Sequence, residues 1–383
     1  MLAGAVLLLI AALAWLSGGI RLGAATLIGA MAGFSLYHAS FGFTSGWRNF
    51  IRDRRGAGLS HQLTLVGLTA IFAIPLIAYG ELIGIHAGGF VFPVGVAMLI
   101  GAFVFGLGMQ LGGGCGSGTL FTVGGGSTRM LVTLAFFILG GLLATYHWDL
   151  WQALPALPAI GLAETALGPP GAIIVTLTGL AGLRFLVRSA ERARHGRLAE
   201  DRPMAAFWRG PWSPSAGVLA LSLVGALTLV TLGRPWGITT GLTLWGAQIA
   251  HAIGVPVADW SYWKHGMTAV EASVFASGAS VMNLGLIFGA MFSATLAGRF
   301  APEAGLSTRD VVTATAGGLL MGYGARLAFG CNIGALLGGI ASGSLHGWAW
   351  FASGFLGSIV GVRLRELIGM DPPRLASGHG APV

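Results

Sequence analysis

Long apolar stretches separated by short polar segments dominate this sequence. Each stretch is close to the ~20 residues that a membrane-spanning helix needs. The uncharged stretches are Leu2–Ile20, Leu22–Trp47, Gln62–Gly80, one that opens near Phe90, Met130–Tyr146, Gly171–Leu183, Ala216–Leu232, Ala272–Leu296, Val311–Phe329 and Trp348–Val362. The pattern predicts an all-α polytopic membrane protein with about 9–10 transmembrane helices plus re-entrant half-helices.

Clusters of arginine predict the orientation of these helices. One cluster follows the second stretch, another fills the long polar linker, and a third closes the chain. Because basic loops stay in the cytoplasm, we expect an inner-membrane protein with its Arg-rich loop and C-terminus cytoplasmic. The clusters are Arg48, Arg52, Arg54 and Arg55; Arg184, Arg188, Arg192, Arg194, Arg197, Arg202 and Arg209; and Arg363, Arg365 and Arg374.

Composition supports the membrane assignment. Hydrophobic residues make up 55% of the 383 positions and charged residues 9%, against roughly a quarter charged in soluble domains. This balance excludes a water-soluble enzyme, and membrane lipid is the expected surrounding. The net charge of +8 does not indicate nucleic-acid binding, because the basic residues fall between apolar runs. Two cysteines are too few for a disulfide framework.

The two halves of the chain resemble each other. Gly106–Leu120 and Gly322–Leu336 share seven of fifteen residues at a constant offset, and both cysteines occupy one equivalent position. Earlier in each half, Gly42–Gly46 (GFTSG) corresponds to Gly237–Gly241 (GITTG). The expected directions of the preceding spans make the copies antiparallel, so we predict two inverted repeats. The expected divisions are residues 1–190 (first repeat), 191–212 (linker), 213–370 (second repeat) and 371–383 (tail).

Glycine breaks next to the cysteines carry the candidate chemistry. Gly112–Gly118 interrupts a helix around Cys115, and a half-helix is expected over Thr119–Val123. Irregular backbone at membrane depth is tolerated where it lines a cavity, and half-helix N-termini attract anions. The alternative is that the glycines serve close packing and the cysteines pack as small hydrophobic residues. Duplication favours a pathway, whose predicted residues are Cys115, Cys331, Gly114, Gly116, Gly330, Asn332 and Arg326.

The residue types around the cysteines suit a transported solute rather than a reaction. A thiol is polarizable and bonds weakly, which suits a soft, sulfur-bearing solute. We expect no metal or other cofactor, since each motif holds one cysteine, and no catalytic residue, since no base accompanies it. Arg326 and Arg129 are candidates for attracting an anion. For Arg326 the alternative is that it snorkels to the surface or satisfies buried carbonyls.

At these motifs the chain resembles the YeeE/YedE family of bacterial inner-membrane proteins, associated with sulfur transport and thiosulfate uptake. The resemblance rests on GFTSGWRNF (Gly42–Phe50), GGGCGSGTL (Gly112–Leu120), GITTG (Gly237–Gly241) and FGCNIGALLGG (Phe329–Gly339). It implies an hourglass-shaped, channel-like transporter whose cysteines, here Cys115 and Cys331, relay thiosulfate by weak hydrogen bonds. Some members carry a third cysteine near the position of Gly42, so a three-thiol relay is not expected here.

The expected function is import of thiosulfate or a similar small sulfur-containing anion, past Cys331 and then Cys115. Related sulfur or selenium species remain open as substrates. A cytoplasmic sulfur-carrier protein remains open as a partner. Two alternatives remain: a channel for another small anion, and a membrane-embedded thiol enzyme that handles sulfane sulfur.

Overall fold

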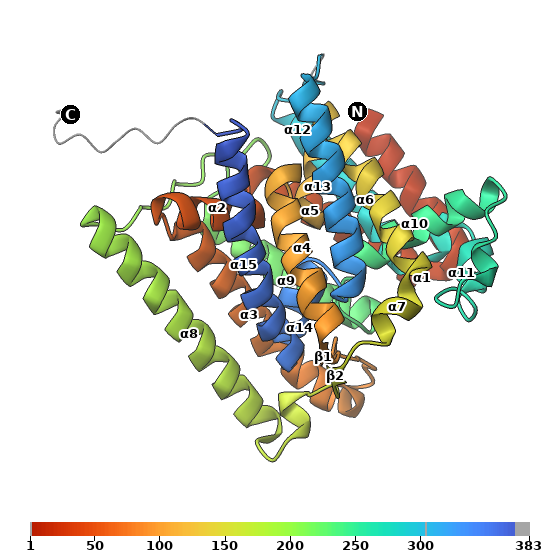
Figure 1. Ribbon diagram of the computed structural model, residues 1–383, viewed down its shortest axis with the longest axis horizontal. Coiled ribbons are helices and arrows are strands. Elements are labelled where there is room, and N and C mark those ends of the chain that lie inside the picture. The colour runs from red at the N-terminus through yellow and green to blue at the C-terminus, as the bar shows by residue number, and fades with distance from the viewer. Residues whose placement is uncertain (1, 303–304, 372–383) are drawn as a thin grey trace.

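The fold is almost entirely helical (Figure 1). The computed structural model describes residues 2–302 and 305–371. Two short strands, β1 (Val94–Gly95) and β2 (Ala156–Leu157), pair antiparallel and form the sheet of the described chain. The α-helices are α1 (Leu2–Ala39), α2 (Phe43–Asp53), α3 (Ala57–Tyr79), α4 (Val96–Gly112), α5 (Gly116–Gly124), α6 (Thr128–Tyr146), α7 (Trp148–Gln152), α8 (Gly168–His195), α9 (Pro214–Leu232), α10 (Ile238–Ala252), α11 (Met267–Glu271), α12 (Gly278–Leu296), α13 (Thr308–Leu327), α14 (Gly338–Ala341) and α15 (Leu345–Leu367). Short 3₁₀ turns cover Gly80–Ile83, Leu162–Glu164, Val257–Asp259 and Val274–Ala276, and a π-helical turn, η5, covers Asn332–Leu337.

The long first helix consists of two segments. The backbone leaves helical geometry at Gly18 and Gly19, where Gly19 has φ of 72°. A Cβ on Gly23 would lie 3.4 Å from the Cβ of Trp15, so the two segments fold back side by side. Glycine permits this reversal because it adopts positive φ without steric cost. The first predicted stretch is therefore the first segment of α1, and the second stretch covers the second segment and the start of α2.

The protein is a multi-pass membrane protein, as predicted. Eight helical segments in the described residues are long and apolar enough to cross a membrane. One of them, Leu2–Asp53, contains both segments of α1. The 23-residue α15 is long enough to cross but is not among the eight. All ten predicted stretches thus lie largely within helices.

Polar side chains mark the starts of two of the membrane helices. Ser213 accepts a hydrogen bond from the N–H of Ala216 and is followed by Pro214, the first residue of α9. Ser307 and Asp310 form a reciprocal capping box at the start of α13. These caps satisfy N–H groups that the helix itself leaves unpaired. They thereby define where α9 and α13 begin.

Glycines bring many of the helices into backbone contact. A Cβ on Gly29 or Gly33 of α1 would meet the backbone of Met282 or Leu286 in α12, and Gly285 meets α1 in the same way. Between membrane helices, small residues allow this close approach and the packing that stabilises it. Close packing therefore accounts for much of the glycine excess outside the two cysteine motifs.

Helices α4 and α13 pack antiparallel at the centre of the molecule. Gly101 of α4 lies against Gly324, and Gly112 lies against Gly317. Residue numbers rise along α4 as they fall along α13, so α4 ends beside the first half of α13. The loops that follow these two helices, each carrying a cysteine, consequently enter the core from opposite ends of the helix pair.

The linker between the halves is folded onto the helix ends. Arg202 donates hydrogen bonds to the carbonyls of Ala39 (2.7 Å) and Trp212 (3.0 Å), and Asp201 accepts from His61 and Ser215. Helix α8 continues to His195, so the first residues of the predicted 191–212 linker are helical. Of the predicted 371–383 tail, residues 372–383, including Arg374, lie outside the described residues.

Candidate functional site

Each cysteine directly precedes a short helical element in the middle of its half. Cys115 precedes α5, which is longer than the expected half-helix over Thr119–Val123. Cys331 precedes η5, which continues into α14. Both cysteines have extended backbones of nearly the same geometry, with φ and ψ of −85° and −170° at Cys115 and −95° and −167° at Cys331. Equivalent sequence positions therefore adopt equivalent local structures.

The N-termini of the two half-helices meet inside the protein. A Cβ on Gly116 would lie only 2.9 Å from the Sγ of Cys331, so this sulfur lies directly against the residue that follows Cys115. The Sγ of Cys115 lies 3.5 Å from the Oγ of Ser117. Both cysteines are buried, with 1% and 0% of their surfaces exposed. The structure thus brings together Cys115, Gly116 and Cys331, which the sequence predicted to share one site.

Two predicted glycines shape the turns that lead into the half-helices. A Cβ on Gly114 would lie 3.0 Å from the backbone nitrogen of Thr119, and one on Gly330 would lie 2.7 Å from that of Ala335. Backbone atoms of a helix cannot move aside as a flexible side chain can. Glycine at these positions therefore allows each loop to turn tightly over the N-terminus of its half-helix.

Asn332 supplies an unpaired polar group beside Cys331. Its side chain is fully buried, and neither Oδ1 nor Nδ2 has a hydrogen-bond partner among the described residues. A buried polar group without a partner is costly and calls for a ligand or water that satisfies it. Asn332 is equivalent to Gly116, so this amide belongs to one half only.

The second half-helix region also borders a small enclosed cavity. It has a volume of about 50 Å³ and lies between α1, α3, α9 and the half-helices. Ser117, Thr69, Thr228 and Ser342 contribute hydroxyl groups to an otherwise largely apolar lining. It is large enough for individual waters.

The Arg326 side chain lies away from this meeting point. Its guanidinium carbon lies 5.2 Å from the ring centroid of Tyr262 and 5.9 Å from that of Trp148. Trp148 is the first residue of α7, and Tyr262 lies in the loop before α11, at the end of the molecule where α13 finishes (Figure 1). The structure therefore places Arg326 in an aromatic layer and does not bring it together with the thiols.

The two loops differ at the residue that precedes each Gly–Cys pair. Gly113 and its equivalent, Phe329, both have positive φ, of 88° and 60°. This conformation is an outlier for a bulky residue. The Phe329 ring stacks on Phe92 at 4.7 Å between centroids, and His346 contacts the edge of Phe92 at 5.1 Å. Sequence reasoning did not single out Phe329, although alignment of the halves places it opposite a glycine.

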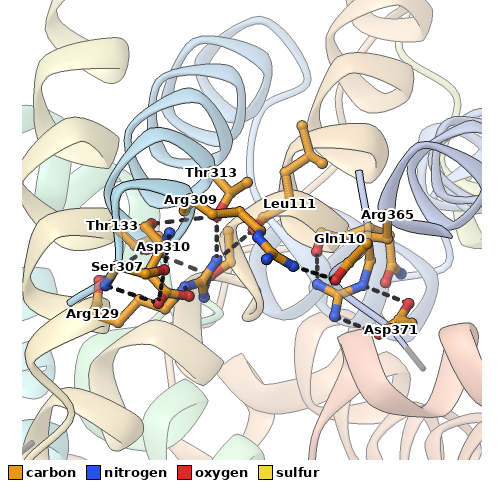
Figure 2. Close-up of polar contacts among 12 residues, drawn as sticks. Gln110, Leu111, Arg129, Thr133, Ser307, Arg309, Asp310, Thr313, Arg365 and Asp371 are labelled. Carbon is orange, nitrogen blue, oxygen red and sulfur yellow. Dashed lines mark hydrogen bonds and ion pairs between the residues drawn. The ribbon is translucent and has the colours of Figure 1, made fainter. Parts of the chain in front are cut away.

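At Gly113 the chain instead borders an open cavity of about 420 Å³. Arginine side chains around it hold the end of α4: Arg129 donates to the carbonyls of Gly112 (2.7 Å) and Leu111 (2.8 Å), and Arg365 donates to that of Gln110 (2.6 Å) (Figure 2). These bonds satisfy carbonyls that the helix end leaves unpaired. Sequence reasoning singled out Arg129 but gave Arg365 no role beyond orientation.

The fold and the site define a class of protein. A multi-pass membrane protein with two half-helices whose N-termini meet in its interior has the construction of membrane transporters built from discontinuous helices. Comparison with known sequences gives the family. The chain belongs to the sulphur transport family, whose profile matches residues 38–360. This confirms the resemblance to YeeE/YedE proteins.

Individual relatives agree with the family assignment. The chain is 33% identical over 156 residues to the probable transporter YedE of Salmonella typhimurium, a match that covers 41% of this chain and 38% of the relative. It is 27% identical to the thiosulfate transporter TsuA of Spirochaeta thermophila over 66% of this chain and 72% of that protein. With TsuA of Escherichia coli strain K12, identity is 25% over 84% of this chain and 88% of the relative. The matched region thus spans less than half of the YedE protein.

Proposed function

We propose that this protein imports thiosulfate, or a similar small sulfur-containing anion, along a central path past Cys331 and Cys115. The observation that carries the proposal is the contact between the Cys331 sulfur and Gly116, where two half-helix N-termini meet. Partial positive charge at those N-termini favours an anion. The thiols and the unpaired amide of Asn332 offer weak hydrogen bonds to its oxygen and sulfur atoms.

The antiparallel packing of α4 and α13 supports a pair of inverted repeats. In this proposal residues 1–190 and 213–370 are the two repeats, and the solute binds where they meet. In this proposal the linker and the end of α15 are cytoplasmic, which the positions of the arginine clusters favour. Cys331, after the outward-running α13, is then the thiol reached first from outside. Arg326 and its aromatic neighbours lie toward the outer mouth.

The sulfur-containing substrate is supported by two relatives named as thiosulfate transporters. Gly42, where some family members carry cysteine, has its carbonyl held by the Gln62 amide at 3.1 Å. The relay proposed here therefore consists of two thiols. A cytoplasmic sulfur-carrier protein as acceptor is a hypothesis motivated by the family resemblance, and its absence from material co-purified with the protein would count against it.

The test is thiosulfate-dependent growth of a bacterial strain that lacks its own thiosulfate uptake. We expect growth with the parent and loss with Cys115→Ala or Cys331→Ala, at matched amounts of membrane protein. Ser222→Ala is the control, because Ser222 is a small buried residue bonded within its own helix to the carbonyl of Val218. Parental growth with both cysteine variants would contradict the thiol relay.

Two further outcomes separate the alternatives. No growth with abundant parent protein would reject thiosulfate as the solute. A covalent persulfide on Cys115 or Cys331 of the purified protein, detected by mass spectrometry, would identify a thiol enzyme in place of a transporter.

A further inference from the structure

We infer that the cavity beside Gly113 is a binding site for a small, doubly charged oxyanion such as thiosulfate or sulfate. We call it the arginine vestibule and define it by the four arginines that line it: Arg48, Arg129, Arg309 and Arg365. The inference rests on the proposed function in one respect only, namely that the anion bound here is also the transported solute.

The vestibule carries excess positive charge. Asp310 is the carboxylate that lines it, and Asp371 pairs with Arg365 at 2.7 Å between Nη2 and Oδ1. Four guanidinium groups against these two carboxylates leave an excess of two positive charges within the described residues. In a partly enclosed cavity this excess attracts a doubly charged anion more strongly than an open surface would.

Three of the four arginines are held in place by hydrogen bonds to backbone carbonyls. Arg129 and Arg365 donate to the carbonyls of Leu111, Gly112 and Gln110 at the end of α4. Arg309 donates to the carbonyl of Gly369. These bonds orient the guanidinium groups. The charge of Arg365 is offset by its ion pair with Asp371, and that of Arg129 by Asp310, whose Oδ1 lies 3.6 Å from the Arg129 Nε. The surplus positive charge of the vestibule therefore belongs to Arg48 and Arg309. The fixed orientation lowers the entropy that binding an anion would cost.

Arg48 supplies the guanidinium that is best placed to bind. It lies in α2, is partly buried and lines the cavity. Asp371 attracts its charge through space, but Arg48 makes no hydrogen bond or close ion pair with the described residues. The neighbouring Arg52 lies 3.7 Å from Glu366, measured between Nε and Oε1, so that carboxylate is already engaged. An arginine facing a cavity without a hydrogen-bonded partner is well suited to a bidentate contact with an oxyanion.

The vestibule borders the proposed pathway. Gly113, part of its wall, lies two residues before Cys115. A Cβ on Gly113 would lie 2.7 Å from the Nη1 of Arg129, so the missing side chain leaves room between the guanidinium and the glycine break. In the proposed orientation this is the cytoplasmic mouth, and the vestibule holds the anion as it leaves Cys115. Phe329 occupies the equivalent position in the other half, where it stacks on Phe92.

The test measures binding of thiosulfate, and separately sulfate, to the purified full-length protein by isothermal titration calorimetry. We expect Arg48→Gln to weaken binding about tenfold, the usual scale for losing one charge-assisted hydrogen-bonding partner, and Arg48→Lys to recover part of the loss. Arg54→Gln is the matched control, since Arg54 has the same charge and lies over the Phe50 ring outside the cavity. Its affinity should equal that of the parent.

A second variant tests the charge argument in the opposite direction. Asp310→Asn removes the lining carboxylate while keeping a side chain that caps α13, so it should tighten binding several-fold. Equal affinities of the parent, Arg48→Gln and Asp310→Asn, at unchanged melting temperatures, would overturn the inference.

Anionic lipid headgroups share the chemistry of these anions, so the source must be distinguished. The titrations are repeated in nanodiscs of phosphatidylcholine with and without phosphatidylglycerol. Loss of thiosulfate binding when phosphatidylglycerol is present would make the vestibule a lipid site and overturn the inference. Arg48-dependent binding without thiosulfate uptake would support the vestibule and reject the proposed function. If Arg48→Gln instead keeps the uptake and the affinity of the parent, the proposed function is supported and the vestibule is rejected.

Discussion

Replacement of Gly116 by alanine tests the meeting of the two half-helices most directly. The new methyl carbon would lie 2.9 Å from the Sγ of Cys331, 3.4 Å from its Cβ and 3.5 Å from the Cγ2 of Ile238. Gly116 does not have the positive φ that strains an alanine. The effect of the substitution therefore comes from packing around the cysteine.

Two opposing contributions determine the change in stability. Overfilling a well-packed core costs about 1–3 kcal/mol, whereas replacing glycine by alanine within a helix gains up to about 1 kcal/mol. We expect a net loss of about 0–3 kcal/mol, which a folded membrane protein can tolerate. Transport should fall much further, because the methyl group occupies the space next to the thiol and displaces Cys331.

The assay compares initial uptake of radiolabelled thiosulfate with the melting temperature of the purified protein. Gly118→Ala is a near-neighbour control, because its Cβ would lie at an ordinary 3.4 Å from the Sγ of Cys115. Gly182→Ala in α8 is a distant control with no atom within 4 Å of the new methyl. Uptake should be lost in Gly116→Ala and kept in Gly182→Ala.

The reasoning would be refuted by parental uptake and parental melting temperature in Gly116→Ala. A double variant with Cys331→Ala refines the result, since removing the sulfur relieves the clash. The double variant should melt at a higher temperature than the sum of the two single effects predicts. Additive effects would mean that the two residues are not in contact.

Two further predictions concern stability. Asn283 is fully buried, donates to the carbonyl of Ile238 at 2.9 Å and accepts from the indole N–H of Trp236 at 3.2 Å. Asn283→Ala should destabilise the protein by about 2 kcal/mol or more in thermal unfolding, because both groups lose a buried partner. An unchanged melting temperature would contradict this. The two hydrogen bonds and the positive charge of Arg365 lower the pKa of Asp371 below its usual range. A lowered pKa contributes stability that is present above the unfolded value and is lost as pH falls through the folded value. The stability advantage of the parent over Asp371→Asn should therefore be constant near neutral pH and decline below about pH 4; an advantage that grows on acidification would contradict the assignment.

Much of the fold could be predicted because the membrane imposes strict conditions on a sequence. Spanning segments must be apolar, about 20 residues long and helical, so the ten stretches follow from residue types. The chain reversal at Gly18 and Gly19 was not predicted. The paired cysteine motifs gave the family, which comparison confirmed. Local chemistry also explained why Cys115 and Cys331 begin half-helices, since glycine runs interrupt a helix.

Contacts between residues of different helices could not be predicted as well from the sequence. Arg326, five residues before Cys331, was expected on the pathway, but one and a half helical turns carry its long side chain to the rings of Trp148 and Tyr262. The partner of Phe329 is Phe92, from a loop 237 positions away in the chain. Neither contact produces a periodic pattern in the sequence, because each depends on how separate segments of the chain pack together.

By itself, the sequence determined the membrane class, the positions of the spans, the duplication and the two cysteine motifs. These features depend on hydrophobicity and backbone propensity, which act over one or two helical turns. Only the tertiary structure decided that Cys331 lies against Gly116, and that Arg48, Arg129, Arg309 and Arg365 surround one cavity. The physical reason is that glycine-mediated contacts set the crossing of α4 and α13, and that crossing brings the end of α4, in the first half, beside the start of α13, in the second.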